Sequence, residues 1–453
     1  MPQNAPQRAV LVAVQLPGVS DAEHASSLAE LGRLAKTLGL AVIARVTQKR
    51  SSLATAAVVG EGKLKELARL TGGSGVVPSG VPAHRARTAE PESADVDDAD
   101  EVDEANDAPS AEQLASVVLI DHDIAPSQAR NLERATGAEV LDRTAVILAI
   151  FQRHARSREA VLQVEIARLA YMAPRLRESG GGKDRQGGGI GAKGAGESHL
   201  ELDRRKVRDR IAELRRELAA IEKDAATRRR RRAAQPTVAI VGYTNAGKSS
   251  LMRALTRSDL LVADQLFATL DTTVRALQPE TKPRILVSDT VGFIKKLPHD
   301  LVASFRSTLD EAREAALLIQ VVDAADPAFP AQIEVTAQVL AEIEAADAPR
   351  LLVLNKIDKL EEERRAALAQ AYPQALLLSA KSPADVAGLR ERIVEFFERE
   401  MVEDEILVPY ARQRVVSDIH ASCRVLAEAY DQDGTRLRVR ARPDVMARLR
   451  AAL

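Results

Sequence analysis

A glycine-rich loop behind a short apolar run decides the fold class of the second half of this 453-residue chain. The run Val238–Val241 predicts a buried strand, and Ser250–Leu255 predicts a helix beyond the loop. The loop matches the pattern G-x-x-x-x-G-K-[ST] without a mismatch, through Gly242, Tyr243, Thr244, Asn245, Ala246, Gly247, Lys248 and Ser249. Such a loop turns backbone N–H groups toward phosphate at the positive end of the helix. We therefore expect a P-loop α/β domain, in which Lys248 reaches the β- and γ-phosphates and the Ser249 hydroxyl binds Mg²⁺.

Three more polar segments follow apolar runs in the order that a nucleotide-binding sheet requires. The predicted strands are Arg284–Ser288, Leu351–Leu354 and Ala375–Leu378. The segments that follow them are Asp289, Thr290, Val291 and Gly292, then Asn355, Lys356, Ile357 and Asp358, and finally Ser379, Ala380 and Lys381. Because the carboxyl ends of parallel strands meet at one edge of a sheet, we expect these segments to surround one nucleotide.

The chemistry of these segments selects guanine. The Asp358 carboxylate can accept both N1–H and N2–H₂ of guanine, which adenine does not offer, and the stem of Lys356 can cover the base. Backbone N–H groups of Ser379–Lys381 are suited to guanine O6. Asp289 would hold the Mg²⁺ shell through water, and the N–H of Gly292 would contact the γ-phosphate. Together the four segments predict a GTPase, with GTP as substrate and Mg²⁺ as cofactor.

A loop segment between the first two motifs is the natural switch I. It consists of Phe267, Ala268, Thr269, Leu270 and Asp271. We expect Thr269 to close on Mg²⁺ and the γ-phosphate when GTP is bound, and the alternative is an ordinary loop threonine. Lys248, Thr269 and Gly292 are the expected catalytic residues.

Two side chains shape the expected hydrolysis. Phe293 stands where Ras-like GTPases place the glutamine that orients water, so hydrolysis should be slow without a partner or a different residue. Asn245 is the position at which potassium-dependent GTPases carry an asparagine. A bound K⁺ and a purely structural role in the loop turn both stay open for it.

Residues 1–143 alternate short apolar runs with helix-periodic segments, which predicts a small α/β domain with a parallel sheet. Its first helix is expected over Asp21–Leu38 with Asp21 as N-cap, and a helix over Pro126–Thr136 should end at Gly137.

Residues 72–112 contain Gly, Ser, Pro, Ala and acids with almost no large apolar side chain. Because such a segment cannot bury enough surface to repay its ordering entropy, we expect a disordered insert. A solvated insert is the simpler interpretation, and a regulatory acidic arm is the alternative.

Residues 144–235 predict a long antiparallel helical hairpin. A helical pattern runs from Asp142 to Arg177, and a second one, with heptad spacing of its apolar residues, runs from Ser198 to Arg230. The loop 179–196 between them is half glycine and carries basic residues, which places a basic tip at the end of the hairpin.

Charge is segregated along the chain, and this indicates the partner. Without the eleven acids between residues 88 and 112, the net charge of −1 becomes +10 for the remainder. Residues 204–232 hold 13 Arg or Lys against 5 acids, an excess that favours a polyanionic partner. We expect this partner to be structured RNA. Because aromatic residues make up only 3% of the chain, backbone phosphate contacts are favoured over base stacking. The residues expected to contact RNA are Arg175, Arg177, Lys183, Arg185, Lys193, Arg204, Arg205 and Lys206.

The remaining features exclude several classes of protein. Cys423 is the single cysteine, which excludes a disulfide framework and fits a reducing cytoplasm. No apolar run is long enough for a membrane span, and no signal peptide is visible at the N-terminus.

Residues 236–400 should form the G domain. Residues 401–453 should form a small α+β unit from Asp404–Tyr410, Ser417–Ala429 and Arg436–Val439.

Several motifs together resemble the HflX family of translational GTPases. They are Gly60–Lys63, Pro126–Leu132, Asp142–Thr144, Leu162–Glu165, Pro174–Leu176, Gly187–Gly191, Gly194–Ser198, Leu200–Arg205, Phe267–Asp271 and Asp289–Ile294. The likeness covers roughly residues 8–71 and 113–400. Residues 72–112 have no counterpart in the family, and Ala195 replaces its usual proline in the tip loop.

The resemblance implies a cytoplasmic factor that binds the large ribosomal subunit and its rRNA. It implies that the helical hairpin inserts toward the peptidyl-transferase region and helps to split stalled or idle 70S ribosomes under stress. Two other functions stay open at this stage: a factor that checks assembly of the large subunit, and a regulatory GTPase with a protein effector. A monomer is expected.

Overall fold

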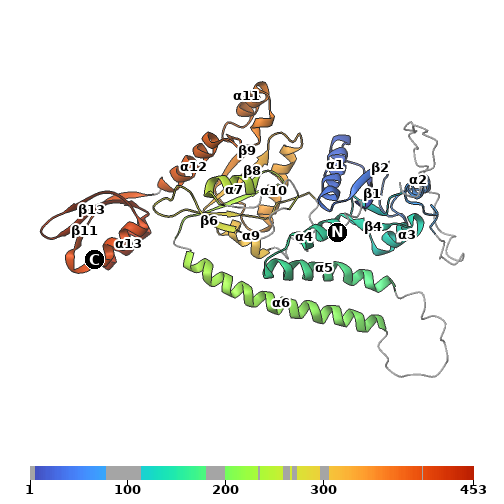
Figure 1. The fold of residues 1–453 in the computed structure, drawn as a ribbon, viewed down its shortest axis with the longest axis horizontal. Coiled ribbons are helices and arrows are strands. Elements are labelled where there is room, and N and C mark those ends of the chain that lie inside the picture. The colour runs from blue at the N-terminus through green and yellow to red at the C-terminus, as the bar shows by residue number, and fades with distance from the viewer. Residues whose placement is uncertain are drawn as a thin grey trace. The chain divides into compact units, whose positions relative to one another are not determined.

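The structure is a computed structural model, and it describes residues 6–77, 114–179, 199–232, 235–258, 266–267, 273–295, 306–399 and 401–453. Its contacts divide the chain into two compact units. Figure 1 labels helices and strands of both. Unit 1 consists of Met1–Arg153 with Val164–Arg215, and unit 2 consists of His154–Gln163 with Arg216–Leu453. Most of the predicted insert 72–112 and of the predicted tip loop 179–196 lies outside the described residues.

Unit 1 contains the predicted parallel sheet. Its four strands pair in the order β2-β1-β3-β4, and every pair is parallel. The strands are β1 (Arg8–Gln15), β2 (Ala41–Lys49), β3 (Val117–Ile120) and β4 (Glu139–Asp142). The helices between them are α1 (Asp21–Thr37), α2 (Glu61–Thr71) and α3 (Pro126–Thr136).

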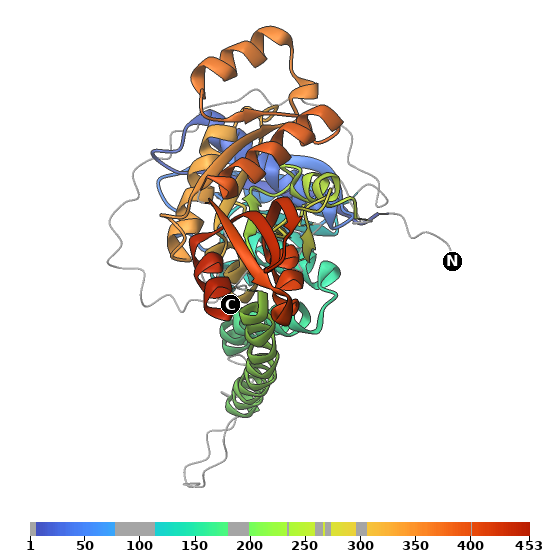
Figure 2. The same cartoon turned by 90° about the vertical axis from the view of Figure 1, so that its left-hand side faces the viewer.

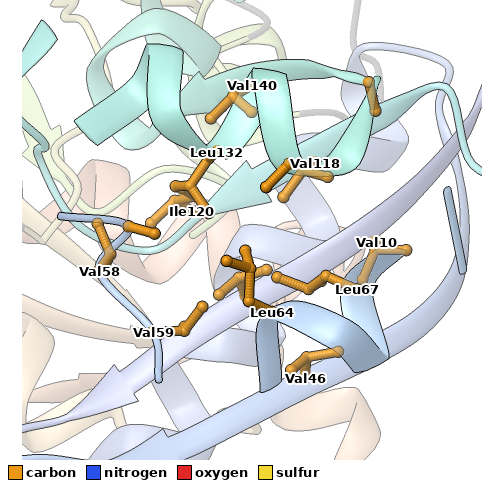
Figure 3. Close-up of a cluster of buried hydrophobic side chains, with 14 of the residues drawn as sticks. Val10, Val46, Val58, Val59, Leu64, Leu67, Val118, Ile120, Leu132 and Val140 are labelled. Carbon is orange, nitrogen blue, oxygen red and sulfur yellow. The ribbon is translucent and has the colours of Figure 1, made fainter. Parts of the chain in front are cut away.

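Branched side chains of the strands form the core of this sheet with two helices. Val10 and Val118 of neighbouring strands lie with Leu64 and Leu67 of α2 and Leu132 of α3 in one cluster, and each is at most 4% exposed (Figure 3). Strands that are buried on both faces read as continuous apolar runs, which is why β1 and β3 could be predicted from sequence.

Two local predictions in unit 1 need correction, and one is confirmed. The N-cap of α1 is Ser20 rather than Asp21, because the Ser20 hydroxyl accepts the N–H of Glu23 at 3.2 Å. Residues 72–77, predicted as the start of a disordered insert, contact the end of α3 through a bond of 2.9 Å from the Gly75 N–H to the Ala135 carbonyl. Gly137 caps α3 with a φ of 68°, as predicted.

The helical region is divided differently from the prediction. The pattern from Asp142 to Arg177 is two helices, α4 (Arg143–His154) and α5 (Arg158–Ser179), because the Ser157 hydroxyl accepts the N–H of Ala160 at 3.1 Å and starts a new helix. The next helix is α6 (His199–Arg232). Within unit 1, Arg210 of α6 pairs with Glu165 of α5 at 3.1 Å.

Unit 2 contains a six-stranded sheet in the order β10-β9-β8-β5-β7-β6, parallel except for β6. Its strands are β5 (Thr237–Gly242), β6 (Thr273–Ala276), β7 (Leu286–Asp289), β8 (Leu317–Asp323), β9 (Arg350–Asn355) and β10 (Leu376–Leu377). Its helices are α7 (Lys248–Thr256), α9 (Arg306–Arg313), α10 (Phe329–Glu342), α11 (Glu362–Ala371) and α12 (Pro383–Glu398). Side chains of α7 and α12 share one core cluster with the sheet, and those of α9 and α10 share another.

The C-terminal part of unit 2 is an antiparallel sheet with two helices (Figure 1 and Figure 2). Its elements are β11 (Val402–Pro409), α13 (Arg414–Ser422), β12 (Arg424–Tyr430), β13 (Gly434–Ala441) and α14 (Pro443–Ala452). The segment Ser417–Ala429, predicted as one element, is therefore divided at Cys423 between a helix and a strand. Searched over the described ranges, the helices include no stretch long and apolar enough to cross a membrane.

Candidate nucleotide-binding site

The phosphate loop connects β5 to α7, and its two glycines are required by close backbone contacts. Gly242 has a φ of +142° and Gly247 a φ of +97°. A Cβ atom on Gly242 would lie 2.1 Å from the carbonyl oxygen of Val321, and one on Gly247 would lie 2.3 Å from Nδ2 of Asn355. Asn245 also adopts a left-handed conformation, with a φ of 61°. The loop can therefore follow this path only with glycine at both positions.

Lys248 lies inside the loop rather than at the surface. Its ammonium group donates to the carbonyl oxygens of Gly242 at 3.1 Å and Tyr243 at 2.9 Å, and the residue is 6% exposed. Burial lowers the pKa of Lys248 to about 8, although the Asp289 carboxylate favours the charged form. A cation buried among backbone dipoles is suited to the phosphates of a nucleotide.

Ser249 and Asp289 provide the oxygen atoms that a magnesium ion would require. The Ser249 hydroxyl, in the first turn of α7, donates to Oδ2 of Asp289 at the end of β7 at 2.7 Å, and Asp289 is 1% exposed. Hydroxyl and carboxylate oxygens are the ligands that Mg²⁺ prefers. In the part of the chain that the structure describes, no group of three or more His, Cys, Asp or Glu side chains could hold a metal by itself.

The segment after β7 is tied to the phosphate loop. The N–H of Thr244 donates to the carbonyl of Phe293 at 2.7 Å, and the N–H of Phe293 donates to the carbonyl of Gly242 at 3.1 Å. A Cβ atom on Gly292 would lie 3.0 Å from the Lys248 ammonium, so this glycine lies against the loop. Thr290 is buried and donates to the carbonyl of Ile240 at 2.8 Å, and Val291 is also buried.

Two phenylalanines and a tyrosine complete this side of the site. The Phe293 side chain is 2% exposed and lies in the core with Val241 and Leu309, so it has no polar group to offer a water molecule. Phe267 is buried too, and its N–H donates to the Thr244 hydroxyl at 3.0 Å. The Tyr243 hydroxyl accepts the N–H of Lys295 at 2.8 Å. The other residues of the predicted switch I, Ala268, Thr269, Leu270 and Asp271, lie outside the described residues.

The predicted guanine-reading residues lie together at the ends of β9 and β10. Oδ1 of Asp358 accepts from the Ser379 hydroxyl at 2.8 Å, and Oδ2 accepts from the Lys381 ammonium at 3.0 Å. These two bonds hold the pKa of the Asp358 carboxyl below its usual range. Asp358 is thus a carboxylate at neutral pH, as acceptance of two guanine N–H groups requires.

Asn355 connects the base-reading segments to the phosphate loop. Its Nδ2 donates to the carbonyl of Ala246 at 2.8 Å, and its Oδ1 accepts the N–H of Ala380 at 3.0 Å. The N–H of Ile357 donates to the carbonyl of Leu378 at 3.4 Å and links β9 to the third segment. One side chain therefore fixes the phosphate loop and the third polar segment at the same time.

Lys356 is held from two sides, and one of its partners was missed in the sequence. Its φ is 64°, and its ammonium donates to the carbonyl of Asn245 at 2.7 Å and to Oδ2 of Asp323 at 2.8 Å. Asp323 ends β8, so the rule that polar residues at strand ends gather at one edge could have found it. Asp385, which accepts the N–H of Ser379 at 2.7 Å, was also missed.

The structure describes the side chains of only some of the basic residues predicted to contact RNA. Arg175 donates to Oδ2 of Asp142 at 2.6 Å, and its guanidinium stacks 3.4 Å from the centre of the Tyr171 ring. On α6, Arg204 is half-buried, Arg205 is exposed, and Lys206 pairs with Asp203 at 3.1 Å. Lys183, Arg185 and Lys193, and the side chain of Arg177, lie outside the described residues.

Three family models match the chain. Residues 25–77 and 83–152 match a model described as GTP-binding GTPase N-terminal, and residues 154–232 match GTP-binding GTPase Middle Region. Residues 237–356 match a model described as 50S ribosome-binding GTPase. Among solved structures, a GTP-binding protein from Sulfolobus solfataricus in complex with GDP is 23% identical with a TM-score of 0.42, over 86% of this chain and 98% of that chain.

Curated relatives match most or nearly all of the chain. The GTPase HflX of Gluconacetobacter diazotrophicus is 57% identical over 98% of this chain and 97% of that protein. The GTPase HflX of Caldanaerobacter subterraneus is 38% identical over 98% and 93%, and that of Escherichia coli is 43% identical over 71% and 76%. With 57% identity to one curated relative over 98% of its length, and with matches to GTPase family models, the chain belongs to the HflX family of GTPases and hydrolyses GTP.

Proposed function

We propose that this GTPase binds the large ribosomal subunit through its rRNA and splits stalled or idle 70S ribosomes under stress. The observation that carries the proposal is the combination, in one chain, of a guanine-nucleotide site with the basic helix α6. The family model matched by residues 237–356 is described as a 50S ribosome-binding GTPase, which supports the same partner. The protein would act in the cytoplasm, where ribosomes work, and as a monomer.

The G domain would occupy residues 236–400, with GTP bound at the edge of the six-stranded sheet. Lys248 would hold the β- and γ-phosphates, and Asp358 would accept the two guanine N–H groups. Ser249 would be a direct ligand of Mg²⁺, with Asp289 in the outer shell and Thr269 joining when GTP is bound. Bound Mg²⁺ would neutralise charge on the phosphate oxygens. A K⁺ ion beside Asn245 would add to that neutralisation.

Burial of Phe293 supports a need for a partner in hydrolysis. The side chain after Gly292 packs in the core, so the chain offers no amide or carboxyl group at this position to orient water. Hydrolysis would therefore be slow alone and faster on the ribosome, where a residue or nucleotide of the partner completes the site. The rate of GTP hydrolysis with and without purified large subunits, in potassium buffer, tests this. No increase with large subunits would count against the ribosome as partner.

The hairpin would address rRNA. Residues 144–235 would form it, with the glycine-rich loop 179–196 at its tip and Arg175, Arg177, Lys183, Arg185, Lys193, Arg204, Arg205 and Lys206 as candidate phosphate contacts. The ion pair between Glu165 of α5 and Arg210 of α6 supports a side-by-side arrangement of the two helices. Because phosphate contacts weaken steeply with salt, association with large subunits should decline strongly between about 50 and 200 mM salt.

Splitting and a role in subunit assembly are separated by one experiment. Intact 70S ribosomes are incubated with the protein and GTP and are then resolved on a sucrose gradient. Splitting predicts a gain in free subunits, which a variant with a shortened loop 179–196 should lose while it keeps its basal hydrolysis. No gain in free subunits would leave the assembly role, and association that survives RNase and high salt would indicate a protein effector instead.

A further inference from the structure

The first turn of α12 contains a carboxylate that reaches back to the guanine-reading segment. Oδ2 of Asp385 accepts the backbone N–H of Ser379 at 2.7 Å. Ser379 is 4% exposed, so its N–H is shielded from water and depends on this acceptor. The hydroxyl of the same residue donates to Oδ1 of Asp358 at 2.8 Å. Asp385 and Asp358 are thus joined through the backbone N–H and the hydroxyl of one buried serine.

The spacing of Ser382 and Asp385 is that of a capping box, but the acid is used differently. Ser382 is the N-cap of α12, and its hydroxyl accepts the N–H of Asp385 at 3.3 Å. In a capping box the acid would return the bond to the N–H of the N-cap residue. Here that N–H donates to the carbonyl of Ser379 at 2.9 Å, and the acid bonds the N–H of Ser379 instead. The helix therefore has its cap, and the carboxylate of Asp385 serves the preceding loop.

We propose that Asp385 is a positioning residue that sets the selectivity of this site for the exocyclic amine of guanine. By fixing the backbone of Ser379, it aims the hydroxyl at Oδ1 of Asp358 and so fixes the plane of that carboxylate. A carboxylate held in one plane can accept hydrogen bonds from N1–H and N2–H₂ of guanine at the same time. A carboxylate that is free to rotate accepts both bonds together for less of the time, so the exocyclic amine contributes less to binding. The inference rests on the proposed role of Asp358 in reading guanine.

Inosine diphosphate provides the probe, because it keeps N1–H and O6 of guanine but lacks the amine at C2. Calorimetry on the full chain gives the ratio of GDP affinity to IDP affinity. For Asp385→Ala we expect this ratio to fall by about three- to tenfold, the effect of one buried hydrogen bond. Asp385→Asn keeps an oxygen acceptor on a side chain of the same length. This variant should keep most of the wild-type preference for GDP over IDP. Asp385→Ser, too short to reach Ser379, replaces the alanine variant if that one does not fold.

Ser382→Ala is the matched control, because it removes the cap of the same helix and leaves the Asp385 carboxylate in place. It should lower the thermal stability of the protein and leave the GDP to IDP ratio unchanged. In the double variant Ser379→Ala/Asp385→Ala, the ratio of GDP affinity to IDP affinity should fall no further than in Ser379→Ala alone. The reason is that Asp385 acts through the Ser379 hydroxyl, which both variants lack.

The results test the role of Asp385 separately from the role of Asp358 in reading guanine. An unchanged ratio in Asp385→Ala, or an equal loss in Ser382→Ala, overturns the role of Asp385. A wild-type protein that binds GDP and IDP equally overturns the guanine assignment of Asp358 itself, on which the inference rests.

Discussion

The Ser249 hydroxyl and the Asp289 carboxylate share a hydrogen bond of 2.7 Å that joins the phosphate loop to the end of β7. The two residues are far apart in sequence and come from different motifs, and the Asp289 carboxylate also acts electrostatically on the buried Lys248 ammonium. The bond joins two of the groups that we propose act on the charge of the phosphates.

Replacement of Ser249 by alanine should remove the magnesium dependence of the enzyme. The variant would lack the hydroxyl that we propose as a direct Mg²⁺ ligand, so GTP turnover should fall by about a hundredfold or more. GDP binding in the presence of EDTA should stay nearly unchanged. Hydrolysis measured across a Mg²⁺ titration checks this, with Ser250→Ala, one residue further along α7, as the control. A magnesium titration like that of the wild type would refute the assignment.

Nucleotide binding should depend on pH through Lys248. Burial lowers its pKa to about 8, whereas bound phosphates favour the charged ammonium and raise that pKa. Above pH 8 binding must therefore take up a proton, and GDP affinity should decrease by up to about tenfold per pH unit. Below about pH 7 the affinity should not depend on this group. Calorimetry at pH 7 and 8.5, in two buffers of different ionisation enthalpy, measures the proton uptake, and its absence at pH 8.5 would contradict the prediction.

Asp358→Asn should change the preferred base. The carboxylate loses charge-assisted hydrogen bonds to guanine, each worth about 1.5–3 kcal/mol, so GDP affinity should decrease by about a hundredfold. The asparagine amide can instead donate to the C2 carbonyl of xanthine. Binding of GDP and XDP to the wild type and the variant tests the exchange. A variant that still prefers GDP strongly would show that another group reads the base.

The stability of unit 1 should decrease strongly when Arg143 is replaced. Its guanidinium is 1% exposed and pairs with Glu30 and, at 2.7 Å, with Asp121. Arg143→Met leaves two buried carboxylates without their cation, which should cost about 3–5 kcal/mol. Hydrogen exchange of β3 and β4 should accelerate, while that of β5 should not change. Arg158→Met, which breaks an exposed pair with Glu217, is the control and should cost at most about 1 kcal/mol.

The structure could be predicted best where only one type of residue fits the local backbone conformation. The glycines of the phosphate loop and the polar residues after β7 and β9 could be placed because a buried strand, a tight turn and a helix leave few alternatives. The parallel sheet of unit 1 could be predicted for the same reason, since its strands are continuous apolar runs.

Contacts that depend on tertiary distance could not be predicted. Arg175 resembles a free basic residue in sequence, but the fold brings Asp142 and the Tyr171 ring to its guanidinium. Asp385 has the spacing of a helix cap, and only the position of Ser379 reveals its other partner. Ser20 and Asp21 are both good N-cap residues, and the choice between them depends on where the chain leaves β1.

The contacts of Asp142 have a mechanical consequence. This residue ends β4, is 2% exposed, and accepts from the Tyr171 hydroxyl at 2.7 Å as well as from Arg175. The C-terminal half of α5 is therefore clamped at two successive turns to the edge of a sheet. Pro174 lies between Tyr171 and Arg175 inside α5, where a proline removes one backbone hydrogen bond of the helix. The two contacts to Asp142 therefore hold α5 to the edge of β4 on both sides of the turn at which the helix is weakest.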